Sequence, residues 1–271
     1  MKTIFITGAS SGIGKATAKH FAGKGWNVIA TMRSPAKETE LNELDNVLIL
    51  RLDVEHKDTI HEAIAKGIER FGRIDVLLNN AGYGTMGIFE SATDDQIRRQ
   101  FDVNVFGLMR MTKAILPHFR VNKSGLIINI SSMGGKITFP TMSLYHATKF
   151  AVEGFTESLS FELAPQNIHV KLIEPGSIST DFNGRSMEFF FDESLTDYSK
   201  FINSVRNGIE KMSELEQFTS PEVVAEVIYQ AATDTTNQIR YVVGEDAKNL
   251  IKIKEESGDL AFIKHMTQMF S

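Results

Sequence analysis

The chain has 271 residues, of which 42% are hydrophobic and 23% are charged, a composition typical of a globular protein. Its net charge is −5 and it has no basic stripe, so we do not expect nucleic acid as a partner. It has no cysteine, which excludes disulfides, thiolate catalysis and zinc–thiolate sites. The sequence contains no run of about 18 apolar residues, so we expect no membrane span. The N-terminus is typical of a strand, not of a signal peptide. We therefore expect no membrane partner and a cytoplasmic location.

Short β-branched runs alternate with helical patterns along the chain. The runs predict strands at Thr3–Thr7, Asn27–Thr31, Val47–Leu52, Val76–Asn79, Leu126–Ser131, His169–Glu174 and Arg240–Val243. The apolar spacing predicts helices near 13–23, 56–71, 94–120, 144–164 and 220–233. Strands that alternate with helices of this length indicate βαβ units and a buried parallel sheet. We predict an α/β fold, a single Rossmann-type domain over residues 1–271 with a doubly wound parallel sheet of about seven strands and helices on both faces.

A glycine-rich segment, TGASSGIG at residues 7–14, follows the first predicted strand. Glycines at 8, 12 and 14 let the backbone turn tightly and approach a pyrophosphate, and the next helix offers free N–H groups. We interpret the segment as a phosphate-binding loop, although glycine here could serve the turn alone. The same letters also fit G-x-S-x-G around Ser10, the nucleophile elbow of serine hydrolases. No well-placed His–Asp pair accompanies that serine.

Tyr145 and Lys149 stand four residues apart on the predicted helix 144–164, so both side chains lie on one face. An ammonium beside a phenol stabilises the phenolate and lowers the pKa of the phenol. We therefore expect Lys149 to lower the pKa of Tyr145 and make it an acid–base catalyst. Taken alone, this spacing is also common on the surface of amphipathic helices.

Several motifs together resemble the short-chain dehydrogenase/reductase family, in its carbonyl reductase and hydroxysteroid dehydrogenase-like branch. The family's T-G-x-x-x-G-x-G matches residues 7–14, and its N-N-A-G matches residues 79–82. Its asparagine matches Asn104 in FDVNVFG, and its active serine matches Ser132, thirteen residues before Tyr145. Its P-G matches residues 175–176, with Thr180 following. The resemblance is close over residues 3–182 and looser beyond them.

The resemblance implies a catalytic set of Asn104, Ser132, Tyr145 and Lys149. Tyr145 would protonate the carbonyl oxygen as a hydride arrives, Lys149 would also hold the nicotinamide ribose, and Ser132 would bond the substrate oxygen. Asn104 would position a water next to Lys149, although a purely structural role for it stays open. A strand-end cap is the alternative for Ser132, and neighbouring Ser131 is distinguished from it only by spacing.

The resemblance also implies a cofactor site. We expect the cofactor to contact Gly8, Ser10, Ser11, Gly12, Ile13, Gly14, Arg33, Asp53, Val54, Asn80, Ala81, Gly82, Tyr145, Lys149, Pro175, Gly176, Ile178 and Thr180. Met32 stands where NAD-specific relatives carry an aspartate, and Arg33 follows it. A guanidinium binds phosphate through paired hydrogen bonds, so we predict NADP as the preferred cofactor, with NAD as the alternative. Ser10, Ser11 or Lys37 would add donors.

The segment 183–218 breaks the alternation of strands and helices. It is longer than an ordinary connection and rich in phenylalanine, so we predict an insertion that acts as a mobile lid over the substrate. Together with 83–89 and 133–144 it should wall an apolar site, through Met86, Ile88, Phe89, Phe139, Met142, Phe189, Phe190, Phe191, Tyr198 and Phe201. Any one of these side chains could instead belong to the core or to a subunit interface.

The most favoured function is an oxidoreductase that transfers a hydride between a nicotinamide cofactor and an apolar or aromatic ketone or secondary alcohol. The alternatives are a serine hydrolase that uses Ser10 and a non-catalytic dinucleotide-sensing protein. His146, next to the tyrosine on the helix, should face elsewhere and serve packing or an interface. No metal cluster is evident. The resemblance implies a homodimer or homotetramer that pairs the long helices near 94–120 and 144–164.

Overall fold

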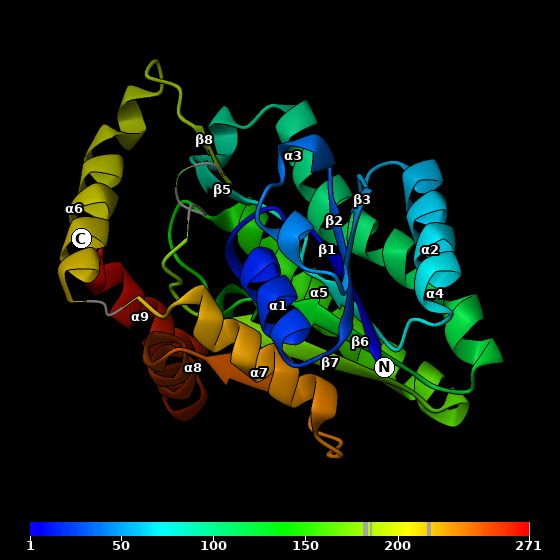
Figure 1. Ribbon diagram of the computed structural model, residues 1–271. Helices are drawn as coiled ribbons and strands as arrows, with labels where there is room; N and C mark the ends of the chain where they lie inside the picture. The colour runs from blue at the N-terminus through cyan, green and yellow to red at the C-terminus, as the bar shows by residue number, and fades with distance from the viewer. Residues whose placement is uncertain (181–183, 185, 216–217, 271) are drawn as a thin grey trace.

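The computed structural model describes residues 1–180, 184, 186–215 and 218–270, without the side chains of 212–215. Its main sheet has seven parallel strands in the order β3-β2-β1-β4-β6-β7-β9, which confirms the predicted Rossmann-type sheet (Figure 1). The bounds of β1, β4 and β9 are those predicted, and each end of the other strands lies within one residue of the prediction: β1 Thr3–Thr7, β2 Asn27–Met32, β3 Val47–Arg51, β4 Val76–Asn79, β6 Gly125–Ile130, β7 Ile168–Pro175 and β9 Arg240–Val243.

The helices cover both faces of this sheet. Their bounds are α1 Gly12–Gly23, α2 Lys57–Phe71, α3 Asp94–Phe101, α4 Leu108–Val121, α5 Ser143–Leu163, α6 Ser199–Leu215, α7 Pro221–Thr233, α8 Glu245–Ser257 and α9 Asp259–Met269. Short 3-10 turns are η1 Pro35–Lys37, η2 Leu41–Glu43, η3 Phe89–Ser91, η5 Met133–Gly135, η6 Ala164–Gln166 and η7 Thr196–Tyr198. None of the helices among the described residues is long and apolar enough to cross a membrane.

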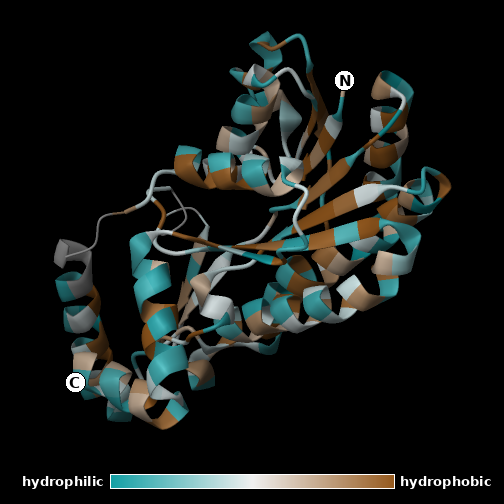
Figure 2. Ribbon diagram, turned by 90° about the horizontal axis from the view of Figure 1, so that it is seen from below, coloured by the Kyte–Doolittle hydropathy of each residue, from teal (hydrophilic) through white to brown (hydrophobic). Residues whose placement is uncertain are grey.

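Alternating strand residues separate two hydrophobic cores. Ile4 and Ile6 of β1 pack in a core with α1 and α7, whereas Phe5 packs in a second core with α2, α4 and α5. This follows from the period of two in a strand, which sends successive side chains to opposite faces. Figure 2 shows mostly hydrophobic strands between helices that mix hydrophobic and hydrophilic residues. The carboxyl ends of the parallel strands therefore share one edge of a sheet that is buried on both faces.

The helix predicted near 94–120 is not continuous. A π-helical segment, η4 (Asp102–Gly107), separates α3 from α4. Asn104 in this segment turns its amide to the backbone of Tyr83, donating to the carbonyl oxygen at 2.8 Å and accepting from the N–H at 3.0 Å. A Cβ at position 107 would lie 2.7 Å from Val54 Cγ2, so the close approach of this segment to the β3 loop requires glycine.

The segment 183–218 contains structure that the sequence did not predict; its first residue, Asn183, lies outside the described residues. β8 (Met187–Phe190) pairs in parallel with β5 (Gly84–Gly87), and α6 follows. At its base, the Thr219 N–H donates to the Ser177 carbonyl and the Ser179 N–H donates to the Thr219 carbonyl. The segment is therefore tied to the domain at β8 and at its base.

Candidate functional site

A cavity of about 850 Å³ opens at the carboxyl ends of the strands, where a doubly wound sheet binds its ligand. It is lined by all of the predicted cofactor residues except Gly14, and by Ser132. Asn104 does not line it. Residues from the loops after six strands thus meet in one space, although they lie between positions 8 and 180 of the sequence.

The glycine loop between β1 and α1 is held closed by Asn80. The Asn80 side-chain amide donates to the carbonyl oxygens of Thr7 and Gly8, both at 2.9 Å. A Cβ at position 14 would collide with the Gly8 carbonyl oxygen and with that amide, and Gly8 has a φ of +71°. Gly14 therefore does not face the cavity but lets the loop fold tightly, which leaves a cradle that suits the pyrophosphate of a dinucleotide.

Cationic and polar side chains surround the cavity beyond β2. Arg33 is exposed and lines the cavity with Ser34 and Lys37. The sequence analysis missed Glu38, a buried acid in this wall whose carboxylate lies 3.2 Å from Lys15 Nζ. Burial alone would raise the pKa of Glu38, but hydrogen bonds from the Leu41 N–H and Lys15 outweigh burial and lower it. The Glu38 carboxylate is therefore ionised and already paired, and no motif spacing marks it in the sequence.

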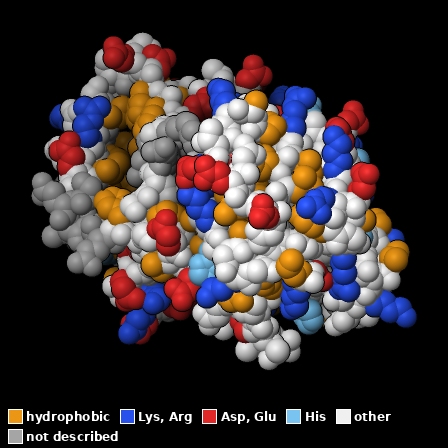
Figure 3. All heavy atoms as spheres, in the orientation of Figure 1, with side chains coloured by type: hydrophobic (Ala, Val, Ile, Leu, Met, Phe, Trp, Pro, Cys, Tyr) orange, Lys and Arg blue, Asp and Glu red, His pale blue; other side chains and the backbone are white. Residues whose placement is uncertain are grey.

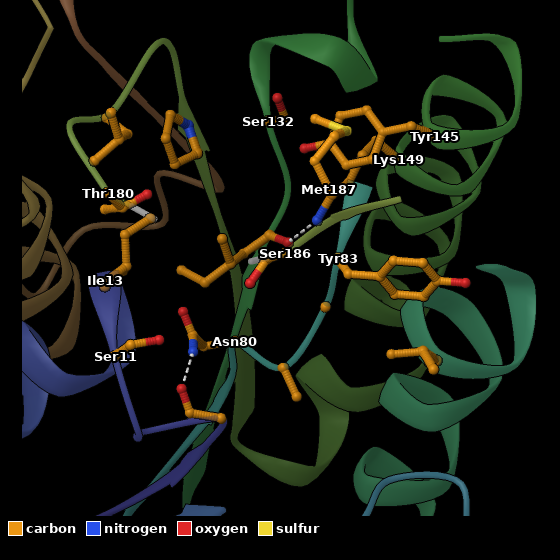
Figure 4. Close-up of a pocket in the computed structure, with 18 of the residues that line it drawn as sticks. Ser11, Ile13, Asn80, Tyr83, Ser132, Tyr145, Lys149, Thr180, Ser186 and Met187 are labelled. Atoms are coloured by element: carbon orange, nitrogen blue, oxygen red, sulfur yellow. Dashed lines mark hydrogen bonds between the residues drawn. The ribbon is translucent and has the colours of Figure 1, made fainter. Parts of the chain in front are cut away.

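Ser132, Tyr145 and Lys149 lie close together in this cavity, at the end of β6 and on the first turns of α5 (Figure 4). The Ser132 and Tyr145 hydroxyls are hydrogen-bonded to each other. Lys149 Nζ donates to the Ile130 carbonyl oxygen at 2.9 Å and lies 5.7 Å from the centre of the Tyr145 ring. Both α5 side chains are buried. The neighbouring Ser131 directs its hydroxyl toward Gly135, so it is Ser132 that reaches the tyrosine.

The prediction that Lys149 lowers the pKa of Tyr145 below its ordinary value is wrong. Burial raises the pKa of Tyr145 to about 12, although the Ser132 hydrogen bond acts in the opposite direction. Burial also lowers the pKa of Lys149 to about 8, with Glu153 opposing this effect. The physical reason is that both groups have lost water, which disfavours the charged form of each, and that the ammonium is directed at Ile130. The tyrosine hydroxyl is therefore protonated at neutral pH.

Two further side chains position this cluster. Besides binding Tyr83, Asn104 donates to the Thr148 hydroxyl at 3.2 Å, and that hydroxyl donates to the Tyr145 carbonyl oxygen. His146 is buried within the subunit: its Nδ1 lies 2.8 Å from the Gly134 carbonyl oxygen. These contacts agree with the structural role left open for Asn104. His146 makes the packing contacts expected of it, but it also lines the cavity, so the expectation that it faces elsewhere is wrong.

His146 also accepts a hydrogen bond at Nε2 from the Phe139 N–H at 2.9 Å, which fixes the proton on Nδ1. The ring therefore joins both ends of the loop that follows Ser132 to helix α5. Burial lowers the pKa of His146, in keeping with a neutral ring.

Ser10, by contrast, is exposed, and within the described part of the chain no histidine hydrogen-bonds to it, so the triad of a hydrolase is not assembled there.

The apolar end of the cavity only partly matches the predicted wall. Met86, Phe139 and Met142 line it as expected. The prediction is wrong for Phe190, which is buried against Gly87, and for six others that do not line it: Ile88, Phe89, Phe189, Phe191, Tyr198 and Phe201. The sequence analysis did not single out Met187 and Ile209, although both lie in the predicted wall segment 183–218, and it missed Phe270, which lies outside all three predicted segments. Figure 3 shows hydrophobic side chains in the hollow beside α6.

Comparisons with known proteins agree with this architecture. A family model described as short chain dehydrogenase matches residues 2–189. An uncharacterized oxidoreductase of Schizosaccharomyces pombe is 40% identical over 239 residues, which cover 88% of this chain and 99% of the relative. A solved short-chain dehydrogenase from Streptomyces avermitilis is 35% identical with a TM-score of 0.81, covering 94% of this chain and 93% of that chain. ElxO, solved with NADP bound, is 30% identical with a TM-score of 0.75, covering 92% of this chain and 98% of that one. Motifs, parallel sheet and relatives thus lead to one conclusion: the chain belongs to the short-chain dehydrogenase family.

Proposed function

We propose that the protein reduces apolar or aromatic ketones to secondary alcohols with NADPH, and catalyses the reverse oxidation, with Tyr145 as general acid and base. The observation that carries the proposal is the buried cluster of Ser132, Tyr145 and Lys149 between a dinucleotide cradle and an apolar wall. The family supplies the cofactor class, and a solved relative carries NADP. The closed glycine loop fits the pyrophosphate, and Arg33 fits a 2′-phosphate.

In the proposed mechanism the bound NADPH supplies the hydride, and the side chains of this chain manage the proton and the developing charge. Tyr145 holds a proton at neutral pH because its pKa is about 12, and it donates that proton to the carbonyl oxygen. Ser132 donates a hydrogen bond to the same oxygen, where negative charge builds. Lys149, with a pKa of about 8, is mostly charged at pH 7 and stabilises the phenolate that Tyr145 becomes. We also assign Lys149 the contact with the nicotinamide ribose.

The apolar wall supports the substrate class. Methionine and phenylalanine side chains line the same cavity as Tyr145: Met86, Met133, Phe139, Met142, Met187, Phe218 and Phe270. Such a lining favours a carbonyl that carries hydrocarbon or aryl substituents, because apolar surface is buried on both partners.

The test is to mix the protein with NADPH and a series of aryl ketones and follow the absorbance of the reduced nicotinamide. Tyr145→Phe should remove nearly all turnover and leave NADPH affinity unchanged, because only the hydroxyl is deleted. Lys149→Ala should damage turnover and NADPH affinity together. Substantial activity in Tyr145→Phe would contradict the acid–base role, and NADPH binding without turnover of any ketone would contradict the enzyme function.

We further propose a homodimer or homotetramer in the cytoplasm, built on the α4 and α5 surfaces. In support, Phe106 of η4 and Phe150 and Phe161 of α5 are exposed, Phe161 to 73%.

We also propose that α6 acts as the moving part of a lid, with β8 as its fixed attachment. Cleavage by a protease within 199–218 should slow when NADPH and a ketone are present, and equal cleavage would argue against a lid.

A further inference from the structure

A third hydrophobic cluster, separate from the two cores of the sheet, lies beside the apolar end of the cavity. We call it the C-terminal cluster; its buried members are Met133, Ile137, Val205, Ala247, Ile251, Phe262, Met266 and Phe270. These side chains come from the loop after Ser132, from α6 and from the last two helices. The cluster therefore joins the loop next to the catalytic residues to the proposed lid through the C-terminus of the chain.

Phe270 belongs both to this cluster and to the wall of the cavity. It follows α9, is only 5% exposed, and lines the cavity together with Met133, Phe139, Ile209 and Phe218. Figures 1 and 2 show the end of α9 beside α6, far from the sheet edge where the chain begins.

The contact between Phe270 and α6 is direct. A Cβ at position 208 would lie 2.5 Å from Phe270 Cδ1 and 3.0 Å from Cε1, so the ring rests on the bare backbone of Gly208. Any larger residue at 208 would push the ring into the cavity or push α6 away from it. Gly208 and Phe270 thus set the distance between the lid helix and the substrate space.

We propose that Phe270 is the residue that limits the size of the substrate, closing the apolar part of the cavity that it lines with Met133, Ile209 and Phe218. This rests on the proposed ketone reductase function. A ketone with a long or bulky apolar substituent would have to displace the ring, whereas a small one would leave it in place. Removing the ring therefore opens the cavity to longer hydrocarbon chains without touching Ser132, Tyr145 or Lys149.

The experiment compares straight-chain methyl ketones from methyl propyl ketone to methyl decyl ketone in wild type and Phe270→Ala. We expect the ratio of kcat/KM for the longest over the shortest to rise about tenfold or more, the range for methylene groups in an apolar pocket. Phe270→Leu should give a smaller rise in the same direction. Gly208→Ala should lower the ratio, and combining it with Phe270→Ala should abolish its effect, because the ring that it displaces is gone.

Two variants control for the fold. Leu260 lies on α9, the helix that Phe270 follows, but it is 87% exposed and outside the cavity, so Leu260→Ala should change nothing. Phe262→Ala removes a ring that is 2% exposed in the same cluster but does not line the cavity, and should lower the melting temperature without the tenfold change. A ratio within twofold of wild type in Phe270→Ala, or an equal change in Phe262→Ala, would overturn the proposal.

A binding measurement separates this proposal from the proposed function. The thermal shift of the NADP-bound protein with methyl decyl ketone, relative to methyl propyl ketone, should increase in Phe270→Ala. An increase without turnover by any variant would refute the reductase function and support the size limit. Turnover without any change in the relative shift or in the ratio would refute the size limit and leave the reductase function intact.

Discussion

Replacing Arg33 with alanine tests how the protein selects its cofactor. Arg33 follows β2 directly and is an exposed cation in the cavity wall. The buried Met32 before it offers no carboxylate that could bind the 2′-hydroxyl of NAD. Glu38 is the acid in this wall that could repel a 2′-phosphate, but Lys15 lies 3.2 Å from it and the Leu41 N–H donates to it at 3.0 Å. The wall is therefore suited to a phosphate through Arg33.

The size of the effect follows from the exposure of the side chain. A hydrogen bond to a charged group contributes about 1.5–3 kcal/mol, and an exposed guanidinium belongs at the lower end because water screens it. At about 1.4 kcal/mol per factor of ten, Arg33→Ala should weaken NADPH binding by roughly tenfold. NADH lacks the 2′-phosphate, so its binding should stay within about twofold of wild type, well below that tenfold loss.

The measurement is the dissociation constant of each reduced cofactor, from nicotinamide fluorescence, together with kcat/KM for each. Lys19→Ala is the matched control. Lys19 is also a cation, but it pairs with Glu40 and does not line the cavity. Equal loss of NADPH and NADH in Arg33→Ala, or a loss in Lys19→Ala as large as in Arg33→Ala, would refute a direct phosphate contact.

Three further predictions concern other parts of the fold. His146→Phe removes both hydrogen bonds to the loop after Ser132, so kcat should fall while NADPH affinity is unchanged; an unchanged kcat would contradict a positioning role. Lys171→Met should cost about 3–5 kcal/mol in urea unfolding, because the buried ammonium lies 2.7 Å from Asp234. Burial opposes ionisation of Asp234, but hydrogen bonds from Lys171 and its neighbours outweigh burial and lower its pKa. The contribution of the Lys171–Asp234 pair to the free energy of unfolding is complete above the ordinary carboxyl pKa of about 3.9 and is lost as the pH falls below it. The loss of stability caused by Lys171→Met should therefore become smaller in acid. Gly87→Ala should release β8, because a Cβ at 87 collides with Phe190, and proteolysis after 187 should accelerate; unchanged cleavage would show that β5 does not hold the lid.

The sheet and the cluster of Ser132, Tyr145 and Lys149 were predictable because their signals are local. The largely apolar segments at 125–130 and 168–175 favour strands that are buried on both faces of a parallel sheet. The carboxyl ends of such strands meet at one edge, so motifs far apart in sequence had to converge there. The four-residue spacing of Tyr145 and Lys149 is likewise a property of one helix.

What the sequence did not reveal depends on contacts between distant segments. The pairing of β5 with β8 joins residues about 100 apart, and neither strand has an apolar pattern of its own that would require it. The π-helical segment at 102–107 continues the helical spacing of its neighbours, so the pattern gives no sign of it, and the close approach of Gly107 to Val54 is visible only in the folded chain. Phe270 becomes part of the site through its contact with α6, which no spacing encodes.

The pKa of Tyr145 is about 12, higher than the sequence predicts, and this changes how the proposed reaction would begin. Burial favours the neutral forms of both Tyr145 and Lys149, which raises one pKa and lowers the other. A neutral tyrosine is what ketone reduction requires at its start, since the proton must be present before it is given. In the proposed reaction a bound nicotinamide cofactor would supply the hydride, and Tyr145 would give up its proton only as negative charge builds on the carbonyl oxygen. Lys149, close to half-charged near pH 8, would stabilise the resulting phenolate and could pass a proton onward at little cost. Burial would therefore keep Tyr145 protonated until the substrate takes the proton, which a solvent-exposed Tyr–Lys pair would do less well.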